Sequence, residues 1–192
     1  MRPVPTSIAA KVMRAADLFA ERGFEQTKIE DIAEATGVAK TTLYYYFVGK
    51  EEILVFLQQE LFTEVADAVA IAGEAPGTAA ERLCEVIRAQ LRVMAERPAL
   101  WRAFLADIGR VAQLPQLVEV LATAYYAPVE RLLDEGVADG SLRASPDPET
   151  TSMAIFGAVS MAGLRRVLAG QPLHPEDLAT QVIAFVLGGL AT

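Results

Sequence analysis

The sequence predicts an all-α protein, and three observations support that fold class. After residue 50, no segment of the 192-residue chain alternates apolar and polar residues as a half-buried strand does. Apolar residues instead recur at spacings of three and four, the period of a helix that buries one face. Glycine, proline and hydroxyl residues separate these stretches as helix ends do. We expect an N-terminal three-helix domain in residues 1–50 and a helical C-terminal domain in residues 51–192.

The segment 27–50 predicts two short helices joined by a tight turn. Thr27 and Glu30 have the spacing of a capping box, so we expect the first helix to begin at Thr27. Gly37 then ends this helix, because glycine adopts the left-handed conformation at little cost. The pattern is that of a helix-turn-helix.

Three consecutive tyrosines distinguish the second of these helices. Leu43 and Phe47, four residues apart, define its buried side and complete a small core. Successive helical residues are rotated by about 100°, so at least two of the phenol rings must face solvent or a partner. Aromatic planes and hydroxyls suit thymine methyls and phosphate oxygens, which makes DNA the expected partner.

Lysines and threonines around these tyrosines supply further phosphate donors. Lys50 stands at the start of the next helix, where the dipole mildly opposes a cation. The position is explained if a DNA phosphate docks at the free amides of that helix end. The predicted DNA-binding residues are Thr27, Lys28, Lys40, Thr41, Thr42, Tyr44, Tyr45, Tyr46 and Lys50.

Residues 10–55 resemble the TetR family of tetracycline-repressor-like transcriptional regulators. Sixteen positions agree at fixed spacing without a gap: Ala16, Leu18, Phe19, Gly23, Thr27, Ile32, Ala33, Gly37, Val38, Thr42, Leu43, Tyr44, Phe47, Lys50, Glu51 and Glu52. The resemblance implies a homodimeric repressor that binds a palindromic DNA operator, and whose C-terminal domain senses a small-molecule effector.

Carried over by position, the resemblance also assigns roles. Tyr45 falls where the family commonly contacts bases, and Thr42, Tyr44, Tyr46 and Lys50 fall where it commonly holds phosphates. The chain departs from the family pattern at three positions, which leaves the operator sequence open. Those positions are Ala39, Thr41 and Gly49.

The charge of the chain agrees with this division. The net charge is −8, which alone argues against a nucleic-acid partner. Residues 1–50 hold four Lys and three Arg against two Asp and four Glu, a net charge of +1, so the other 142 residues carry −9. The positive charge therefore lies in the expected DNA-binding domain.

The residue types present argue against an enzyme and against a cofactor. With one cysteine, Cys84, and one histidine, His174, a transition-metal site has too few soft ligands. No phosphate-binding glycine loop occurs. The apolar runs near residues 153–164 and 182–191 are shorter than a membrane span, and the N-terminus lacks a secretory signal. We expect a cytoplasmic protein without a membrane partner.

The C-terminal domain is expected to contain five helices beyond the linker helix at about 51–72. Thr78 and Glu81 form a capping box for the first, and Pro98 begins the second. The third, at about 115–137, contains Pro128 and should kink near residue 124. The last two extend over about 148–168 and 175–187.

Small residues recur on one side of those last two helices, which allows close helix approach. In the resembled family the final two helices form a four-helix bundle across the dimer; ordinary packing in an alanine-rich chain is the alternative. The predicted interface residues are Ala154, Ala158, Ala162, Ala184 and Gly188.

A set of aromatic and methionine residues in the body could line an effector cavity. They are Met94, Trp101, Phe104, Leu105, Tyr125, Tyr126, Met153 and Phe156. Plain core is the alternative for each. The sequence thus predicts a repressor released from its operator by a small apolar or aromatic ligand; the alternative is a helical small-molecule or partner-binding protein that has lost DNA binding.

Overall fold

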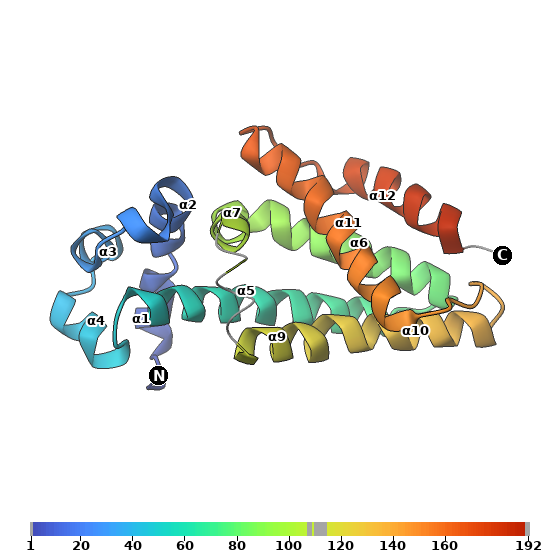
Figure 1. Cartoon of the computed structure of the whole chain (residues 1–192), viewed down its shortest axis with the longest axis horizontal. Helices are drawn as coiled ribbons and strands as arrows, with labels where there is room; N and C mark the ends of the chain where they lie inside the picture. Colours follow the sequence, from blue (N-terminus) through green and yellow to red (C-terminus); the bar gives the residue numbers. More distant parts are fainter. Residues whose placement is uncertain (1, 107–108, 110–114, 191–192) are drawn as a thin grey trace. The chain divides into compact units, whose positions relative to one another are not determined.

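The computed structural model describes residues 2–106, 109 and 115–190, and every regular element in these residues is helical. The expected all-α class is therefore confirmed (Figure 1). The chain divides into two compact units. One contains Met1–Leu61 with Ala99–Leu117, and the other contains Phe62–Pro98 with Val118–Thr192.

The first unit holds the helix-turn-helix. Its helices are α1 (Thr6–Val12), α2 (Ala15–Gln26), α3 (Ile29–Thr36), α4 (Lys40–Tyr46), the start of α5 (Lys50–Gly73) and α7 (Pro98–Ala106). The core that the spacing predicted is confirmed, since Ile32, Leu43 and Phe47 are at most 1% exposed. Helix α5 runs on past residues 50 and 51, and the domain boundary expected there stays a prediction.

The turn between α3 and α4 has the predicted glycine. Gly37 ends α3 with a φ of 65° and a ψ of 24°, the left-handed conformation that a side chain would strain. The expected start of α3 is wrong by two residues. Lys28 is the N-cap, and its backbone N–H donates to Asp31 Oδ2 at 3.0 Å. Asp31, rather than Glu30, supplies the carboxylate because the helix begins at Ile29.

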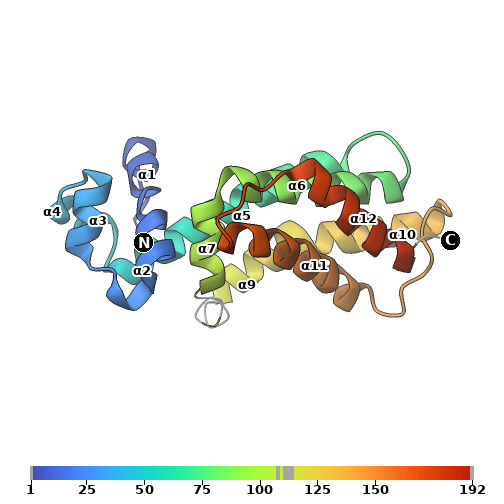
Figure 2. The same ribbon diagram turned by 90° about the horizontal axis from the view of Figure 1, so that it is seen from above.

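The second unit is built on α6 (Ala79–Glu96). The capping box is confirmed, with Thr78 N–H donating to Glu81 Oε2 at 2.8 Å and Glu81 N–H to Thr78 Oγ1 at 3.3 Å. Helix α6 packs against α10, α11 and α12, which surround it in the two views of Figures 1 and 2. Their bounds are Ala127–Ala138, Pro148–Leu168 and Pro175–Leu190.

Pro128 disturbs the helix that precedes it. The segment is α9 (Pro115–Leu121), a π-helical turn (Ala122–Tyr126) and then α10. Proline has no N–H and its ring crowds the carbonyl four residues back, that of Ala124. A wider π turn accommodates this clash, while the kink expected near residue 124 stays a prediction.

Polar residues from the loop between α10 and α11 fix one end of α11 and one end of α12. Asp147 caps α11 by accepting from the N–H of Thr150 at 3.3 Å. Arg143 holds the end of α12, since its backbone N–H donates to Leu190 O at 2.8 Å and its Nε to Gly189 O at 2.6 Å. In the described residues, no helix is long and apolar enough to cross a bilayer.

Candidate DNA-binding surface and regulatory interior

The tyrosines of α4 lie as their spacing predicted. Tyr44 is 50% exposed and Tyr45 is 59% exposed. Tyr46 is half-buried, and its ring meets that of Tyr45 edge-on with 4.9 Å between centroids. Two large aromatic rings on a seven-residue helix are thus available to a partner, which a helix serving only its own core would not require.

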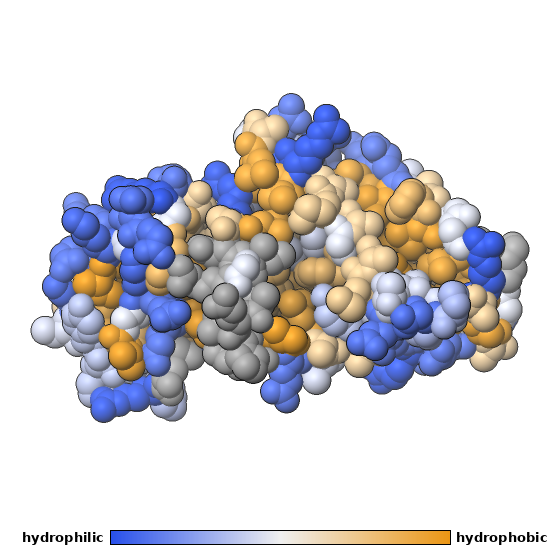
Figure 3. Space-filling view, in the orientation of Figure 1, coloured by the Kyte–Doolittle hydropathy of each residue, from blue (hydrophilic) through white to orange (hydrophobic). Residues whose placement is uncertain are grey.

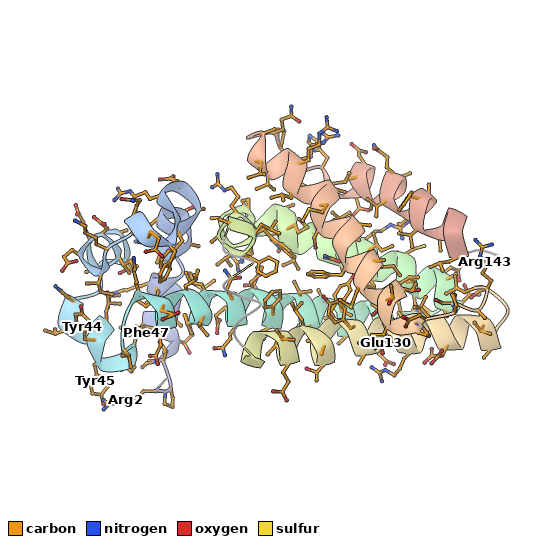
Figure 4. The ribbon with its side chains drawn as sticks, viewed as in Figure 1. Arg2, Tyr44, Tyr45, Phe47, Glu130 and Arg143 are labelled. Atoms are coloured by element: carbon orange, nitrogen blue, oxygen red, sulfur yellow. The ribbon has the colours of Figure 1, made fainter. Side chains whose placement is uncertain are left out.

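Arg2 extends this surface from the N-terminus, and sequence reasoning missed it. Its guanidinium carbon lies 4.4 Å from the centroid of the Tyr45 ring. Figure 4 shows the two labelled side chains next to each other. The two residues share a groove of about 300 Å³. The groove is lined by Arg2, Tyr44, Tyr45, Tyr46, Val48 and Glu52.

Lys40 is exposed at the start of α4 and forms an ion pair with Glu30 of α3. This hydrogen bond raises the pKa of Lys40 and lowers that of Glu30. Both side chains are well solvated, so the pair contributes little to stability. To bind a phosphate Lys40 must leave Glu30. Lys28 and Thr41 are also exposed, and Thr42 is half-buried.

The structure contradicts the predicted DNA contact of Thr27, while that of Lys50 stays a prediction. Thr27 is fully buried, and its hydroxyl donates to the Gly23 carbonyl at 2.8 Å. Lys50 points to the end of α2, where Nζ donates to Phe24 O at 2.7 Å and to Glu25 O at 3.1 Å. Both side chains hold the helix-turn-helix together, because their polar groups are used by backbone carbonyls of the same unit.

Three of the predicted effector residues come together in the second unit. Tyr125, Tyr126 and Phe156 pack edge-on, with ring centroids 5.0 to 5.9 Å apart. Met94 is fully buried on α6, close to the backbone of Gly163. These aromatic rings come from the π turn and α11, so they form one cluster between two elements.

A chain of hydrogen bonds crosses this apolar interior, and no sequence pattern predicts it. The hydroxyl of Tyr125 donates to Gln90 Oε1 at 2.7 Å, and Gln90 Nε2 donates to Ser160 Oγ at 3.0 Å. All three residues are buried. Burial raises the pKa of Tyr125 well above its ordinary value. The polar groups are spaced in sequence by 35 and 70 residues, which periodicity cannot reveal.

Met153 does not belong to this interior, and its prediction as a lining residue is wrong. It is 51% exposed on the outer side of α11. Trp101, Phe104 and Leu105 belong to the first unit, whereas the other predicted effector residues belong to the second. Trp101 and Phe104 pack edge-on with 5.7 Å between centroids, and Leu105 is half-buried.

The outer side of α11 and α12 is apolar. Ala154, Ala184 and Gly188 are exposed there, and Ala158 and Ala162 are half-buried. Larger side chains flank them, with Phe185 76% exposed and Met161 51% exposed. A groove of about 470 Å³ lies between the helices and includes Ala154, Ala158 and Gly188. Figure 3 shows apolar residues gathered over this part of the second unit.

Metal and thiol chemistry find little support in the described residues. No three histidine, cysteine or acidic side chains among them are grouped to hold a metal ion. Cys84 is half-buried, and burial raises the pKa of its thiol, so the reactive thiolate is disfavoured.

Comparison with known families matches nearly the whole chain. Residues 13–55 match bacterial regulatory proteins of the tetR family, and residues 76–190 match the tetracyclin repressor-like C-terminal domain. The first range covers the helix-turn-helix with the exposed tyrosines, and the second covers the helices around α6.

Relatives are similar over the same length. The HTH-type transcriptional repressor KstR2 of Mycolicibacterium smegmatis is 28% identical over 178 residues, 92% of this chain and 86% of the relative. The fold matches the fatty acid degradation regulator FadR from Bacillus halodurans with a TM-score of 0.85 at 24% identity, over 98% of both chains.

A third comparison has a bound ligand. The FadR of Bacillus subtilis in complex with stearoyl-CoA superposes with a TM-score of 0.78 at 22% identity, over 94% of this chain and 98% of that one. Fold, surface and family matches agree. The chain belongs to the TetR family of bacterial regulatory proteins, and is a DNA-binding transcriptional repressor rather than an enzyme.

Proposed function

We propose that the protein is a cytoplasmic homodimer that represses transcription by binding a palindromic operator through α4. The observation that carries this proposal is the exposed pair Tyr44 and Tyr45 on the second helix of the helix-turn-helix. A recognition helix of this motif enters the major groove, where ring faces meet thymine methyls and hydroxyls meet phosphates. Tyr45 contacts bases, while Thr42, Tyr44 and Tyr46 contact the backbone.

Lysines at the edges of the motif bind the flanking phosphates in this proposal. Lys28 and Lys40 are exposed, and Lys40 exchanges Glu30 for a phosphate when DNA binds. The released Glu30 carboxylate repels that phosphate. This repulsion lowers the affinity of Lys40 for phosphates that are not well placed to accept from it. Residues 51–192 carry a net negative charge, which disfavours DNA binding to that part of the protein.

The dimer forms through the outer side of α11 and α12. Small residues such as Ala158 and Gly188 let helices from two protomers approach closely, and Phe185 fills the space beside them. A two-fold dimer presents two copies of α4, which matches a palindromic site. An apolar surface of this kind would otherwise face water.

The effector is a molecule with a long hydrocarbon part and a polar group, of the fatty acyl-CoA class. The regulators of similar fold point to this class, since one is named for fatty acid degradation and another is bound to stearoyl-CoA. The cluster of Tyr125, Tyr126 and Phe156 supplies apolar surface, and Gln90 and Ser160 supply hydrogen-bonding groups. In this proposal the hydrocarbon chain lies against the aromatic cluster, and the hydrogen-bonding groups orient the polar end.

Release from DNA requires that the effector prefer one arrangement of the two domains. A ligand with equal affinity for both arrangements shifts nothing. Binding is also reciprocal, so operator DNA must lower effector affinity by the same factor as effector lowers operator affinity, typically about 5–150-fold.

The test begins with selection of bound sequences from random duplex DNA. Recovery of a two-fold symmetric sequence, shifted in a gel by the purified protein, is expected. The complex is then titrated with stearoyl-CoA, octanoyl-CoA and free coenzyme A. Stearoyl-CoA should release the DNA while coenzyme A does not, because the hydrocarbon part supplies the binding energy.

Each half of the proposal has its own contrary result. If no duplex is bound above the level of random DNA, the protein is a small-molecule or partner-binding member of the family that has lost DNA binding. If DNA is bound but neither thioester releases it at saturation, the acyl-CoA class is wrong while DNA recognition stands.

A further inference from the structure

We propose that Arg2 is a DNA-contacting residue that acts together with Tyr45, an inference that rests on the proposed DNA recognition by α4. Its guanidinium stacks on the Tyr45 ring and donates to a pair of acceptor atoms on the operator. Those acceptors are either two phosphate oxygens or the O6 and N7 of a guanine, which present the same geometry to a guanidinium.

The stacking geometry leaves the donors of Arg2 available. The guanidinium carbon lies 4.4 Å from the Tyr45 centroid, inside the roughly 6 Å range of a cation–π contact. A cation–π contact occupies none of the N–H donors of the guanidinium, which lie in its plane. The side chain is exposed, so an acceptor can reach these groups.

The charge of Arg2 is also available. Among the described residues Arg2 forms no ion pair, whereas Lys40 is held by Glu30 and Lys50 by the carbonyls of α2. Arg2 lies beside Tyr45 and can therefore bind DNA without first losing an ion pair among the described residues. A planar cation on an aromatic ring also loses little rotational freedom on binding.

The backbone explains why Arg2 stays beside Tyr45. Pro3 and Pro5 fix their own φ angles and hold Arg2 and Val4 in extended conformations. Pro5 has a φ of −61° and a ψ of 143°, and α1 begins at the next residue. A short, stiff arm thus joins Arg2 to a helix of the same unit and limits how far the guanidinium can move from α4.

The consequence for recognition is a coupled pair. Stacking restricts the Tyr45 ring to fewer orientations, and the ring in turn positions the guanidinium edge. Loss of either residue should therefore weaken the contact made by the other, which independent phosphate contacts would not do.

The experiment compares the intact protein with Arg2→Ala, Arg2→Lys, Tyr45→Ala and the double variant Arg2→Ala with Tyr45→Ala. The DNA is the duplex selected by the intact protein, and an unrelated duplex of equal length. Arg14→Ala is the control, because it removes the same charge from an exposed side chain of the same unit. Thermal unfolding checks that every variant folds.

We expect Arg2→Ala to bind the selected duplex at least tenfold more weakly than Arg14→Ala does. The loss of affinity in the double variant should be smaller than the product of the fold-losses in the two single variants. Two further results distinguish the acceptors. If Arg2 contacts a phosphate, Arg2→Ala lowers the magnitude of the salt slope by about 0.9, and Arg2→Lys largely keeps the slope. If Arg2 contacts a guanine, Arg2→Ala relaxes the preference at one base pair, and the lysine of Arg2→Lys replaces the planar guanidinium only in part.

Two results would overturn the inference, and they differ. If Arg2→Ala binds as tightly as Arg14→Ala while the intact protein binds DNA specifically, Arg2 makes no contact and only this inference fails. If the intact protein binds neither duplex, DNA recognition by α4 and the role of Arg2 fail together.

Discussion

The ammonium of Lys50 at the start of α5 donates to the carbonyl of Phe24 at 2.7 Å and lies 4.4 Å from the centroid of its ring. A second hydrogen bond reaches the Glu25 carbonyl at 3.1 Å. Carbonyls at the end of a helix lack intrahelical partners and carry partial negative charge. Lys50 therefore stabilises the end of α2, and the interaction outweighs the mild opposition of the α5 dipole to a cation there.

Lys50→Ala should destabilise the first unit rather than remove a phosphate contact. We expect a loss of about 1 kcal/mol in the free energy of unfolding, as for a charge-assisted hydrogen bond at a partly exposed site. The salt slope of DNA binding should stay unchanged. Lys28→Ala is the matched comparison, and it should lower the slope by about 0.9 with little effect on unfolding. A lower salt slope in the Lys50→Ala variant would instead show that Lys50 contacts a phosphate.

Tyr45→Ala should cost about 1–3 kcal/mol of binding to the selected duplex and weaken discrimination between bases. Tyr45→Phe separates the ring from the hydroxyl, because it keeps the surface on which Arg2 stacks. It should retain most of the affinity if thymine methyls are the partners. Equal losses in both variants would instead assign the contact to the hydroxyl.

Gly188→Leu should produce monomers without disturbing the protomer. A Cβ added at Gly188 meets no atom within 4 Å, so the new side chain has room in the protomer itself. In a dimer packed through this side of α12 it would hold the protomers apart. Sedimentation should show monomers, and operator affinity should fall because both half-sites must be bound at once.

Gly163→Ala provides the contrast for that experiment. A Cβ there would lie 2.4 Å from Met94 Cε, the end of a flexible side chain that can shift, so this variant should change stability little and remain dimeric. A fully dimeric Gly188→Leu that binds DNA normally would place the interface elsewhere.

Two buried glutamines should respond in opposite ways to replacement by leucine. Gln58 is fully buried, and neither its Oε1 nor its Nε2 has a hydrogen-bond partner among the described residues. An unsatisfied buried polar atom costs about 1–3 kcal/mol, so Gln58→Leu should raise the free energy of unfolding. Gln90→Leu should lower it by a similar amount, because it leaves Tyr125 and Ser160 unpaired. Urea unfolding measures both, and destabilisation by Gln58→Leu would contradict the expectation.

The burial of Tyr125 predicts a loss of stability at alkaline pH. Burial raises its pKa in the folded protein, so the folded state keeps the phenol proton above the ordinary pKa of about 10 while the unfolded chain releases it. The unfolded state then binds fewer protons, and stability falls as pH rises from about 10. Tyr125→Phe should unfold more easily at neutral pH, having lost the Gln90 bond, but show a shallower decline above pH 10. Parallel declines would show that Tyr125 does not titrate on unfolding.

Much of the fold was predictable because helix ends and buried stripes depend on nearby residues. The Thr78 and Glu81 box and the left-handed Gly37 both lie within one or two turns of the residues that cause them. The exposure of Tyr44 and Tyr45 followed from the rotation per residue alone.

The errors share a different cause. Met153 was assigned to the interior because methionine suits an apolar cavity, but its side of α11 was decided by where that helix packs. Thr27 was assigned to a cap and to DNA because its type allows both. Composition and residue type state what a side chain is able to do, while its neighbours decide which option it takes.

The sequence by itself determined the helices, the turn of the helix-turn-helix and the outward tyrosines, since periodicity and local backbone preferences act over a few residues. Only the tertiary structure decided which atoms from distant segments meet. Lys50 reaches a carbonyl 26 residues away, and Arg2 reaches a ring on α4. Neither meeting follows from spacing, because both depend on how separate helices pack around one core, a result of side-chain shape summed over the whole unit.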